Sequence, residues 1–217
     1  MNTKTTNQLA VLFDFDGVVI DTETQYSNFW HQIGVEYLGI DDIEGRVKGQ
    51  TLVYIYDTFF AGKEREQAEI TERLLRFEQQ MSFDYLPGVR HFIDELKQKG
   101  VKTAVVTSSN KAKMEAVYRV HPEVKTMFDR ILTAEMFTAS KPAPDCFLLG
   151  MEVFGTTPEQ TYVFEDSLNG LKAGMASGAT VIGLATTYAR EDIASLCHYI
   201  IDDFDGFTYE KMTKVHK

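Results

Sequence analysis

The feature that most constrains this chain is an apolar run that ends in two carboxylates. Residues 9–13 are apolar, Asp14 and Asp16 follow with one residue between them, and Gly17 comes next. Five apolar residues ahead of a glycine turn are too few for a helix and indicate a buried strand. Because residues two apart in a strand point the same way, both carboxylates can lean toward one point at the strand end.

Two carboxylates that close together need a positive partner, because like charges repel. A hard divalent cation such as Mg²⁺ takes oxygen ligands and suits this pair. The alternative is an ordinary surface turn, since Asp-Gly is a common turn signal. The pair alone leaves both interpretations open, so partners elsewhere in the chain must decide between them.

The rest of the chain divides into a helical stretch and an alternating stretch. Between residues 22 and 82, apolar residues recur at helical spacing, and Gly39 and Gly62 follow two of the expected helices. Beyond Pro87, short β-rich runs alternate with amphipathic helices, which is typical of βαβ units and a parallel sheet. The strand candidates are residues 9–13, 101–107, 128–132, 161–164, 180–184 and 199–201.

This pattern predicts an α/β fold, in which a Rossmann-like parallel sheet is flanked by helices. The helical stretch interrupts the alternation directly after the first strand, as an inserted domain would. We therefore expect residues 1–20 and 86–217 to form the core domain. Residues 21–85 are expected to form a small all-helical cap domain.

Polar side chains gather where the predicted strands end. In open parallel sheets, ligands bind outside the carboxyl ends of the strands, and these ends meet at one edge. The convergence of several polar sets at that edge is stronger evidence for a site than any one motif. Besides Asp14 and Asp16, the sets are Thr107 with Ser108 and Ser109, Lys141 in a loop before a helix, and Glu165 with Asp166.

These groups suit phosphoryl transfer. Asp14 and Asp166, with help from Asp16 and Glu165, could hold one Mg²⁺ together with water and phosphate oxygens. One aspartate could attack phosphorus and a second could donate and then accept a proton. Such an attack needs positive charge nearby, because one anion approaches another.

Two further residues could bind the phosphate itself. Thr107 offers a hydroxyl and nearby backbone N–H groups, and Lys141 offers a positive point charge. Each set also has a simpler interpretation. Thr107 could belong to a helix N-cap cluster, Lys141 could be a solvated loop lysine, and Glu165 and Asp166 could serve only the next helix N-terminus.

The composition of the chain limits the classes of partner that it can bind. A formal net charge of −10 argues against a general nucleic-acid or anionic-membrane binder, although a local cation can still admit an anionic substrate. No apolar stretch approaches the roughly 18 residues of a membrane span, and the first eight residues lack an apolar signal core. The two cysteines, Cys146 and Cys197, have no metal-ligand spacing. We expect a cytoplasmic protein that acts as a monomer.

The chain resembles the haloacid dehalogenase-like superfamily, in particular the branch of β-phosphoglucomutases and small sugar-phosphate phosphatases. Four motifs carry the resemblance in the right order along essentially the whole chain. They are Asp14-Phe15-Asp16-Gly17-Val18 with Asp21-Thr22, Val106-Thr107-Ser108-Ser109, Lys141-Pro142-Ala143-Pro144-Asp145, and Phe164-Glu165-Asp166-Ser167 with Gly170.

The resemblance implies a role for each motif residue. Asp14 would be the nucleophile and would bind Mg²⁺, and Asp16 would be the acid/base and would bind the metal through its backbone carbonyl. The acidic residue at position 16 favours phosphoryl transfer over dehalogenation, because dehalogenase members lack it. Asp166 would complete the metal site, with Glu165 close by as a group that supports the metal ligands. Thr107, Ser108 and Lys141 would hold the transferring phosphoryl group.

The departures from the family concern the substrate. Mutases of this branch tend to carry a His where this chain has Tyr26, and a cap Arg where it has Leu52, after Lys48-Gly49-Gln50-Thr51. A mutase must hold a bisphosphorylated intermediate at both ends, so the loss of that grip favours hydrolysis. Arg46 or Lys48 could replace the missing cap Arg in binding the second phosphate. The residues expected to set specificity are Tyr26, Trp30, Lys48, Gln50 and Tyr54.

The sequence thus predicts a Mg²⁺-dependent phosphatase that acts on a small phosphorylated metabolite, a sugar phosphate in particular, through an aspartyl-phosphate. Three alternatives stay open: a β-phosphoglucomutase-type phosphohexomutase, an inorganic pyrophosphatase, and a non-catalytic metabolite-binding protein.

Overall fold

The computed structural model describes residues 8–48 and 50–217. The first seven residues of the predicted core domain and Gly49 of the Lys48-Gly49 pair lie outside these ranges. The chain forms two compact units. The core unit consists of Met1–Asp21 and Tyr85–Lys217, and the helical unit consists of Thr22–Asp84.

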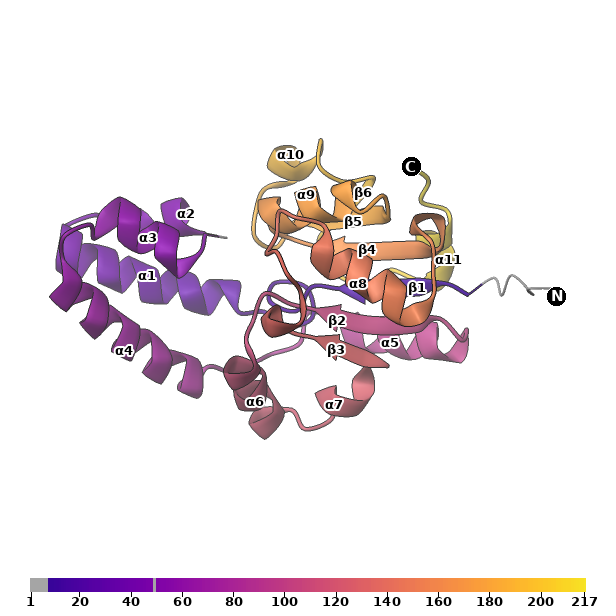
Figure 1. Cartoon of the computed structure of the whole chain (residues 1–217), viewed down its shortest axis with the longest axis horizontal. Coiled ribbons are helices and arrows are strands. Elements are labelled where there is room, and N and C mark those ends of the chain that lie inside the picture. Colours follow the sequence, from indigo (N-terminus) through magenta and orange to yellow (C-terminus); the bar gives the residue numbers. More distant parts are fainter. Residues whose placement is uncertain (1–7, 49) are drawn as a thin grey trace. The chain divides into compact units, whose positions relative to one another are not determined.

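The core unit is built on a six-stranded sheet in which all paired strands run parallel (Figure 1). The strand order is β3-β2-β1-β4-β5-β6. This confirms the predicted α/β, Rossmann-like fold. The strands are β1 (Ala10–Phe13), β2 (Lys102–Val106), β3 (Arg130–Leu132), β4 (Thr161–Glu165), β5 (Thr180–Leu184) and β6 (Tyr199–Ile201).

Strand β1 lies at the centre of the sheet, between β2 and β4, and fixes the position of the residues at its carboxyl end. Ala10 is in register with Lys102 of β2 on one side and with Thr161 of β4 on the other. All four residues of β1 are buried, as expected of a strand covered on both faces. The chain runs from β1 toward one edge through β2 and toward the other through β4, and in sheets of this kind ligands bind at the carboxyl ends of the strands where the order switches.

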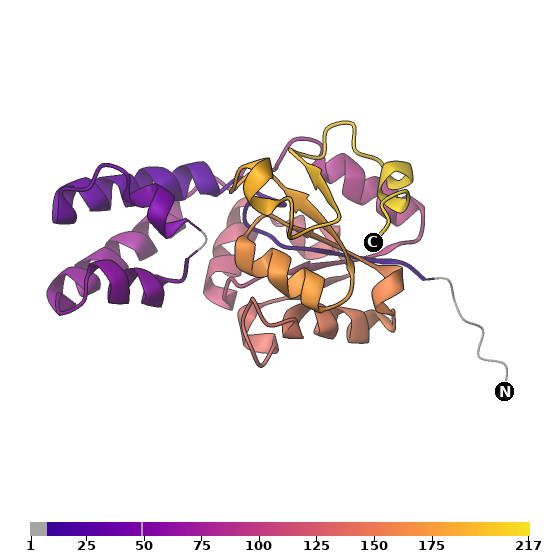
Figure 2. The same ribbon diagram turned by 90° about the horizontal axis from the view of Figure 1, so that it is seen from above.

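Helices cover both faces of this sheet (Figure 2). Leu12 and Val163 belong to a core cluster with side chains of α8 (Asp145–Phe154) and α9 (Leu168–Ala176). The neighbouring residues Phe13 and Phe164 point to the opposite face, where their rings stack with centroids 5.1 Å apart. The strand alternation therefore gives the sheet one mainly aliphatic face and one aromatic face.

The aromatic face is covered by α5 (Val89–Gln98) and by the chain near its C-terminal helix α11 (Tyr209–Thr213). Phe92 of α5 contacts Phe13 edge-on and stacks on Phe204 at 5.4 Å. The remaining helical segments of the core are α6 (Lys111–Val120), α7 (Val124–Met127), α10 (Arg190–Ile193) and the 3₁₀ turns η1 (Ala134–Met136) and η2 (Pro158–Gln160).

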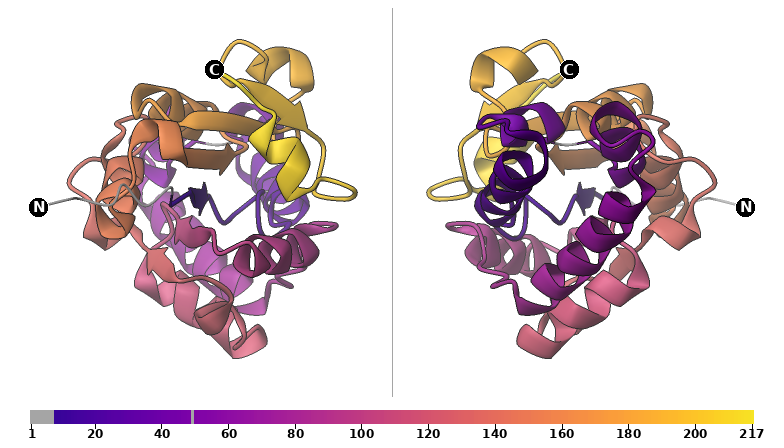
Figure 3. Two further views of the ribbon diagram at one scale, coloured as in Figure 1. Left: turned by 90° about the vertical axis from the view of Figure 1, so that its right-hand side faces the viewer. Right: turned by 90° about the vertical axis from the view of Figure 1, so that its left-hand side faces the viewer.

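The described residues of the inserted unit form helices and no strand (Figure 3, right). Its own core includes Phe29, Trp30, Ile33, Phe60 and Ile70. No helix in the described part of the chain is both long enough and apolar enough to cross a bilayer. The helices of this unit are α1 (Glu23–Leu38), α2 (Ile43–Val47), α3 (Leu52–Phe59) and α4 (Glu64–Gln80).

Candidate active site

Asp14 is the first residue after β1, and its backbone N–H donates to the carbonyl of Phe164 at 2.9 Å. Gly17 follows in a tight turn with φ of 72°, a conformation that suits glycine. A Cβ at Gly17 would overlap the Asp166 carboxylate, and Thr186 Oγ1 donates to the Gly17 carbonyl at 2.6 Å. The turn therefore lies directly against Asp166 of the Glu165-Asp166 pair, the second acidic motif of the site.

Lys141 joins the two acidic motifs. Its Nζ lies 2.9 Å from Asp14 Oδ1 and 2.6 Å from Glu165 Oε1, and it also donates to the Val106 carbonyl at 3.3 Å. Its side chain is only 5% exposed, so it is no solvated loop lysine. Burial alone would lower the pKa of Lys141, but Asp14 and Glu165 together raise that pKa above its ordinary value and keep the amine charged.

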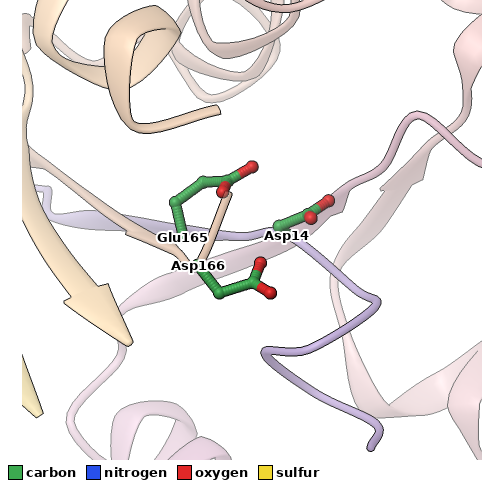
Figure 4. A group of neighbouring side chains, drawn as sticks. All are labelled: Asp14, Glu165 and Asp166. Atoms are coloured by element: carbon green, nitrogen blue, oxygen red, sulfur yellow. The ribbon is translucent and has the colours of Figure 1, made fainter. Parts of the chain in front are cut away.

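Three carboxylates form a group that could hold a cation. Asp14, Glu165 and Asp166 each offer an oxygen, and these oxygens lie within 4.8 Å of one another (Figure 4). With all three ionised and Lys141 protonated, the group carries a net charge of −2. Oxygen donors and this charge fit a hard divalent ion such as Mg²⁺, which would neutralise the group.

The second acidic motif is fixed in place by its neighbours. Glu165 Oε2 accepts from the backbone N–H of Ser167 at 2.7 Å, and a Cβ at Gly170 would overlap the Glu165 carboxylate. Thr187 Oγ1 donates to Asp166 Oδ2. Glu165 and Asp166 are both buried, and Glu165, which was expected to assist Asp14 and Asp166 at the metal site, belongs to the same carboxylate group.

The environment of Asp14 disfavours a bare carboxylate. Burial raises the pKa of Asp14 to about 7, with Lys141 opposing the rise and Glu165 adding to it. A divalent cation beside Asp14 would counter this effect and favour the ionised form, which is the form a nucleophile needs.

The Asp16 carboxylate contacts the segment after β2 instead of the carboxylate group. Its Oδ2 accepts from Ser109 Oγ at 2.8 Å, and its Oδ1 lies 2.8 Å from Lys113 Nζ. Its side chain is therefore not part of the carboxylate group, although its predicted metal contact was through the backbone carbonyl. Lys113 was not predicted as a site residue. The only sequence signal for it is its place in the first turn of the helix that follows the Val106-Thr107-Ser108-Ser109 motif.

The predicted phosphate-binding residues lie at the end of β2, the neighbour of β1. Thr107 is buried, donates its N–H to the Leu132 carbonyl at 3.0 Å and accepts from the N–H of Ser109 at 2.9 Å. Ser108 is exposed beside it. With Lys141, they give the core unit cationic and neutral donors at the same sheet edge as Asp14.

The predicted specificity residues are spread over the helical unit. Tyr26 donates its hydroxyl to Glu78 Oε1 at 2.8 Å, and Lys48 lies 3.9 Å from Glu23 Oε2. Gln50 and Tyr54 are exposed. Trp30 is only 6% exposed and packs in the core of this unit, which explains its presence without a substrate role.

Comparison with known proteins identifies relatives of the chain. A family model described as haloacid dehalogenase-like hydrolase matches residues 11–184. The chain is 31% identical, over 83% of its length, to the chloroplastic Protein SUPPRESSOR OF QUENCHING 1 of Arabidopsis thaliana, of which it spans 18%. It is 29% identical to hexitol phosphatase A of Escherichia coli strain K12, over 80% of this chain and 81% of the relative.

Solved structures share the fold. The structure of a HAD hydrolase, family IA, variant 3 from Entamoeba histolytica superposes with a TM-score of 0.80 at 22% identity. The match covers 96% of this chain and 99% of that one. The likeness therefore extends over both units of the chain.

Proposed function

The chain belongs to the haloacid dehalogenase-like hydrolase family and is a phosphatase-type enzyme, and we propose that it hydrolyses a small phosphorylated metabolite with Mg²⁺. The observation that carries this proposal is the group formed by Asp14, Glu165 and Asp166 around Lys141. The name of hexitol phosphatase A, a relative over four fifths of the chain, supports a sugar phosphate as the substrate.

In the first step, an Asp14 carboxylate oxygen attacks phosphorus and the bond from phosphorus to the ester oxygen breaks. Asp16 gives its proton to that oxygen, which leaves as an alcohol, and an aspartyl-phosphate remains on Asp14. Lys141 and the donors at Thr107 and Ser108 hold the phosphoryl oxygens and stabilise their charge.

In the second step, water attacks the phosphorus of the aspartyl-phosphate. Asp16 takes the water proton, and the bond from phosphorus to the Asp14 oxygen breaks, which releases inorganic phosphate and restores the carboxylate. Asp14 and Asp166 would hold Mg²⁺ with the Asp16 carbonyl, and Glu165 lies beside them. When bound, the ion offsets the negative charge of the nucleophile and of the phosphoryl group.

We also propose that the helical unit serves as the cap of this enzyme. It is inserted between two short connections, at residues 21–22 and 84–85, and the turn at Gly17 leads into the first of them. A cap would exclude bulk water during the first step and admit water for the second.

The test is a panel of phosphate esters with and without Mg²⁺, run on the native chain and on Asp14→Asn. We expect phosphate release from sugar phosphates with Mg²⁺ and none with the variant, because the amide is no nucleophile. Circular dichroism of the variant checks that the fold is intact. Undiminished turnover by Asp14→Asn contradicts the mechanism.

The same panel separates the alternatives. Glucose 6-phosphate formed from β-glucose 1-phosphate in place of free phosphate identifies a mutase. Release from pyrophosphate alone identifies a pyrophosphatase. Tight metabolite binding without phosphate release under any metal identifies a binding protein.

A further inference from the structure

The carboxylate of Asp16 is gripped by two residues of the segment after β2. Ser109 Oγ donates to Oδ2 and Lys113 Nζ to Oδ1, each at 2.8 Å. Lys113 lies in the first turn of α6, where its backbone N–H donates to the side chain of the N-cap residue Asn110 at 2.9 Å. Both partners of the ion pair are therefore held by the structure around them.

This ion pair is more shielded than an ordinary surface pair. The side chains of Lys113 and Asp16 are 11% and 21% exposed. Exposed pairs contribute little because water and salt screen them, whereas charges with this degree of burial interact more strongly. An unpaired Asp16 carboxylate would also be drawn toward any cation held two residues away at Asp14.

The pair also separates Asp16 from the carboxylate group. Asp14, Glu165 and Asp166 come within 4.8 Å of one another, and the side chain of Asp16 is outside that set. When Asp16 is ionised, as it is between the two proposed steps, Lys113 balances its charge locally, just as Lys141 balances part of the charge of the other three. The carboxylate group with Lys141 thus keeps a net charge of −2, which a divalent ion matches, instead of −3.

We propose that Lys113 is a positioning residue that keeps the Asp16 carboxylate away from the cation and aimed for proton transfer. This inference rests on the proposed function, in which Asp16 moves protons and only its carbonyl faces Mg²⁺. Without Lys113, the Asp16 carboxylate turns toward the carboxylate group and acts as an additional metal ligand. The ion is then bound more tightly and the proton is delivered less well.

The first test measures Mg²⁺ binding to the metal-free chain by calorimetry, which requires no turnover. Lys113→Met is expected to lower the Kd by about threefold to tenfold, because a positive charge leaves and an anionic ligand joins the group. Lys111→Met is the matched control. It removes the same charge from the same helix turn, but the Lys111 side chain is exposed, and its backbone N–H donates to Glu135 at 3.0 Å.

The second test compares two leaving groups. An alkyl phosphate needs a proton on its leaving oxygen, whereas p-nitrophenol departs without one. Lys113→Met is expected to lower kcat/KM for the alkyl ester by about tenfold or more and for the aryl ester by less than about threefold. Lys113→Arg, which keeps the charge and the donor, is expected to restore most of the activity.

Tighter Mg²⁺ binding together with a leaving-group-dependent loss supports the proposal, because a merely structural defect lowers both affinity and activity. A Kd equal to that of the native chain or of Lys111→Met overturns it, as does an equal loss for both esters. Lys113→Gln, which removes the charge but keeps a polar side chain, takes the same test if Lys113→Met unfolds. Absence of phosphate release by the native chain would instead contradict the proposed function.

Discussion

Single residues of the site are held by partners that the linear motifs do not reveal. Asp166 is an example, because the Thr187 hydroxyl donates to one of its oxygens from the loop after β5. Hydrogen bonds to a metal ligand orient it, and their loss weakens metal binding. Thr186, the preceding residue, directs its hydroxyl to the Gly17 carbonyl instead.

Thr187→Val is therefore expected to weaken Mg²⁺ binding by about tenfold, within the range for partners of metal ligands. Calorimetric titration of the metal-free chain measures the effect. Thr186→Val is the matched control and should change the affinity less. Equal affinities of both variants would show that Thr187 does not orient Asp166.

The protonation of Asp14 gives the metal-free chain a characteristic pH dependence. The pKa of Asp14 rises from an ordinary 3.8 to about 7 on folding, chiefly because of burial. A pKa raised on folding contributes stability below the unfolded value, and this contribution is lost as the pH rises through the folded value. In EDTA, we expect Asp14 to reduce the free energy of unfolding between about pH 4 and about pH 7.

Urea unfolding of the native chain and of Asp14→Asn across this range tests the expectation. The fall in stability with pH should be smaller in the variant, whose amide does not titrate. Addition of Mg²⁺ should stabilise the native chain at pH 7, because the ion favours the ionised carboxylate. Identical pH profiles of the two proteins would contradict the role of Asp14 burial.

Elements bring these residues together, and α9 does so through its first turn. Ser167 caps the helix by accepting from the N–H of Gly170, and it also donates to Glu165. Gly170 lies where a side chain would overlap the Glu165 carboxylate. The start of this helix therefore fixes one member of the carboxylate group.

Gly170→Ala is expected to destabilise the protein by about 1–3 kcal/mol, as overpacking does, and to weaken Mg²⁺ binding. Gly45→Ala in helix α2 is the control. Apart from its chain neighbours and the backbone of its own helix, no atom of the described residues lies within 4 Å of a Cβ at Gly45, so the same change should be neutral or stabilising there. Unfolding by urea measures both, and a neutral Gly170→Ala would rule out the close packing against Glu165.

The elements that carry a strong pattern were predictable from sequence. The buried strands and long helices show clear apolar runs or helical spacing, and Gly39 does follow α1 as a left-handed C-cap. The short helices α7, α10 and α11 have no counterpart in the prediction, because four or five residues hold too little periodicity to be recognised.

Part of the site was also predictable, because clear sequence patterns place some of its residues at the strand ends. Motif order and strand ends bring Asp14, Lys141, Glu165 and Asp166 to one edge of the sheet, which the alternating pattern implies. The direction of a side chain depends on contacts that are distant in sequence. Lys113 lies 97 residues from Asp16, and no local pattern links the two.

The whole molecule combines a strongly acidic chain with a site that needs positive charge. The net charge of −10 repels an anionic substrate at long range. This repulsion must be offset locally, and Lys141 with a bound divalent ion would neutralise the carboxylates that face the phosphate. The family match over residues 11–184 includes the inserted helical unit. Activity should therefore be measured on the whole chain, with both units present.

The most direct measurement is the mass of the peptide that contains Asp14 after a single turnover, with enzyme in excess and an acid quench. With Mg²⁺ and a sugar phosphate, we expect one phosphoryl group on Asp14 at early times and none once water has released it. Asp14→Asn should carry none. Turnover without a phosphoryl group on Asp14 at any time, or with the group on another residue, would contradict the account.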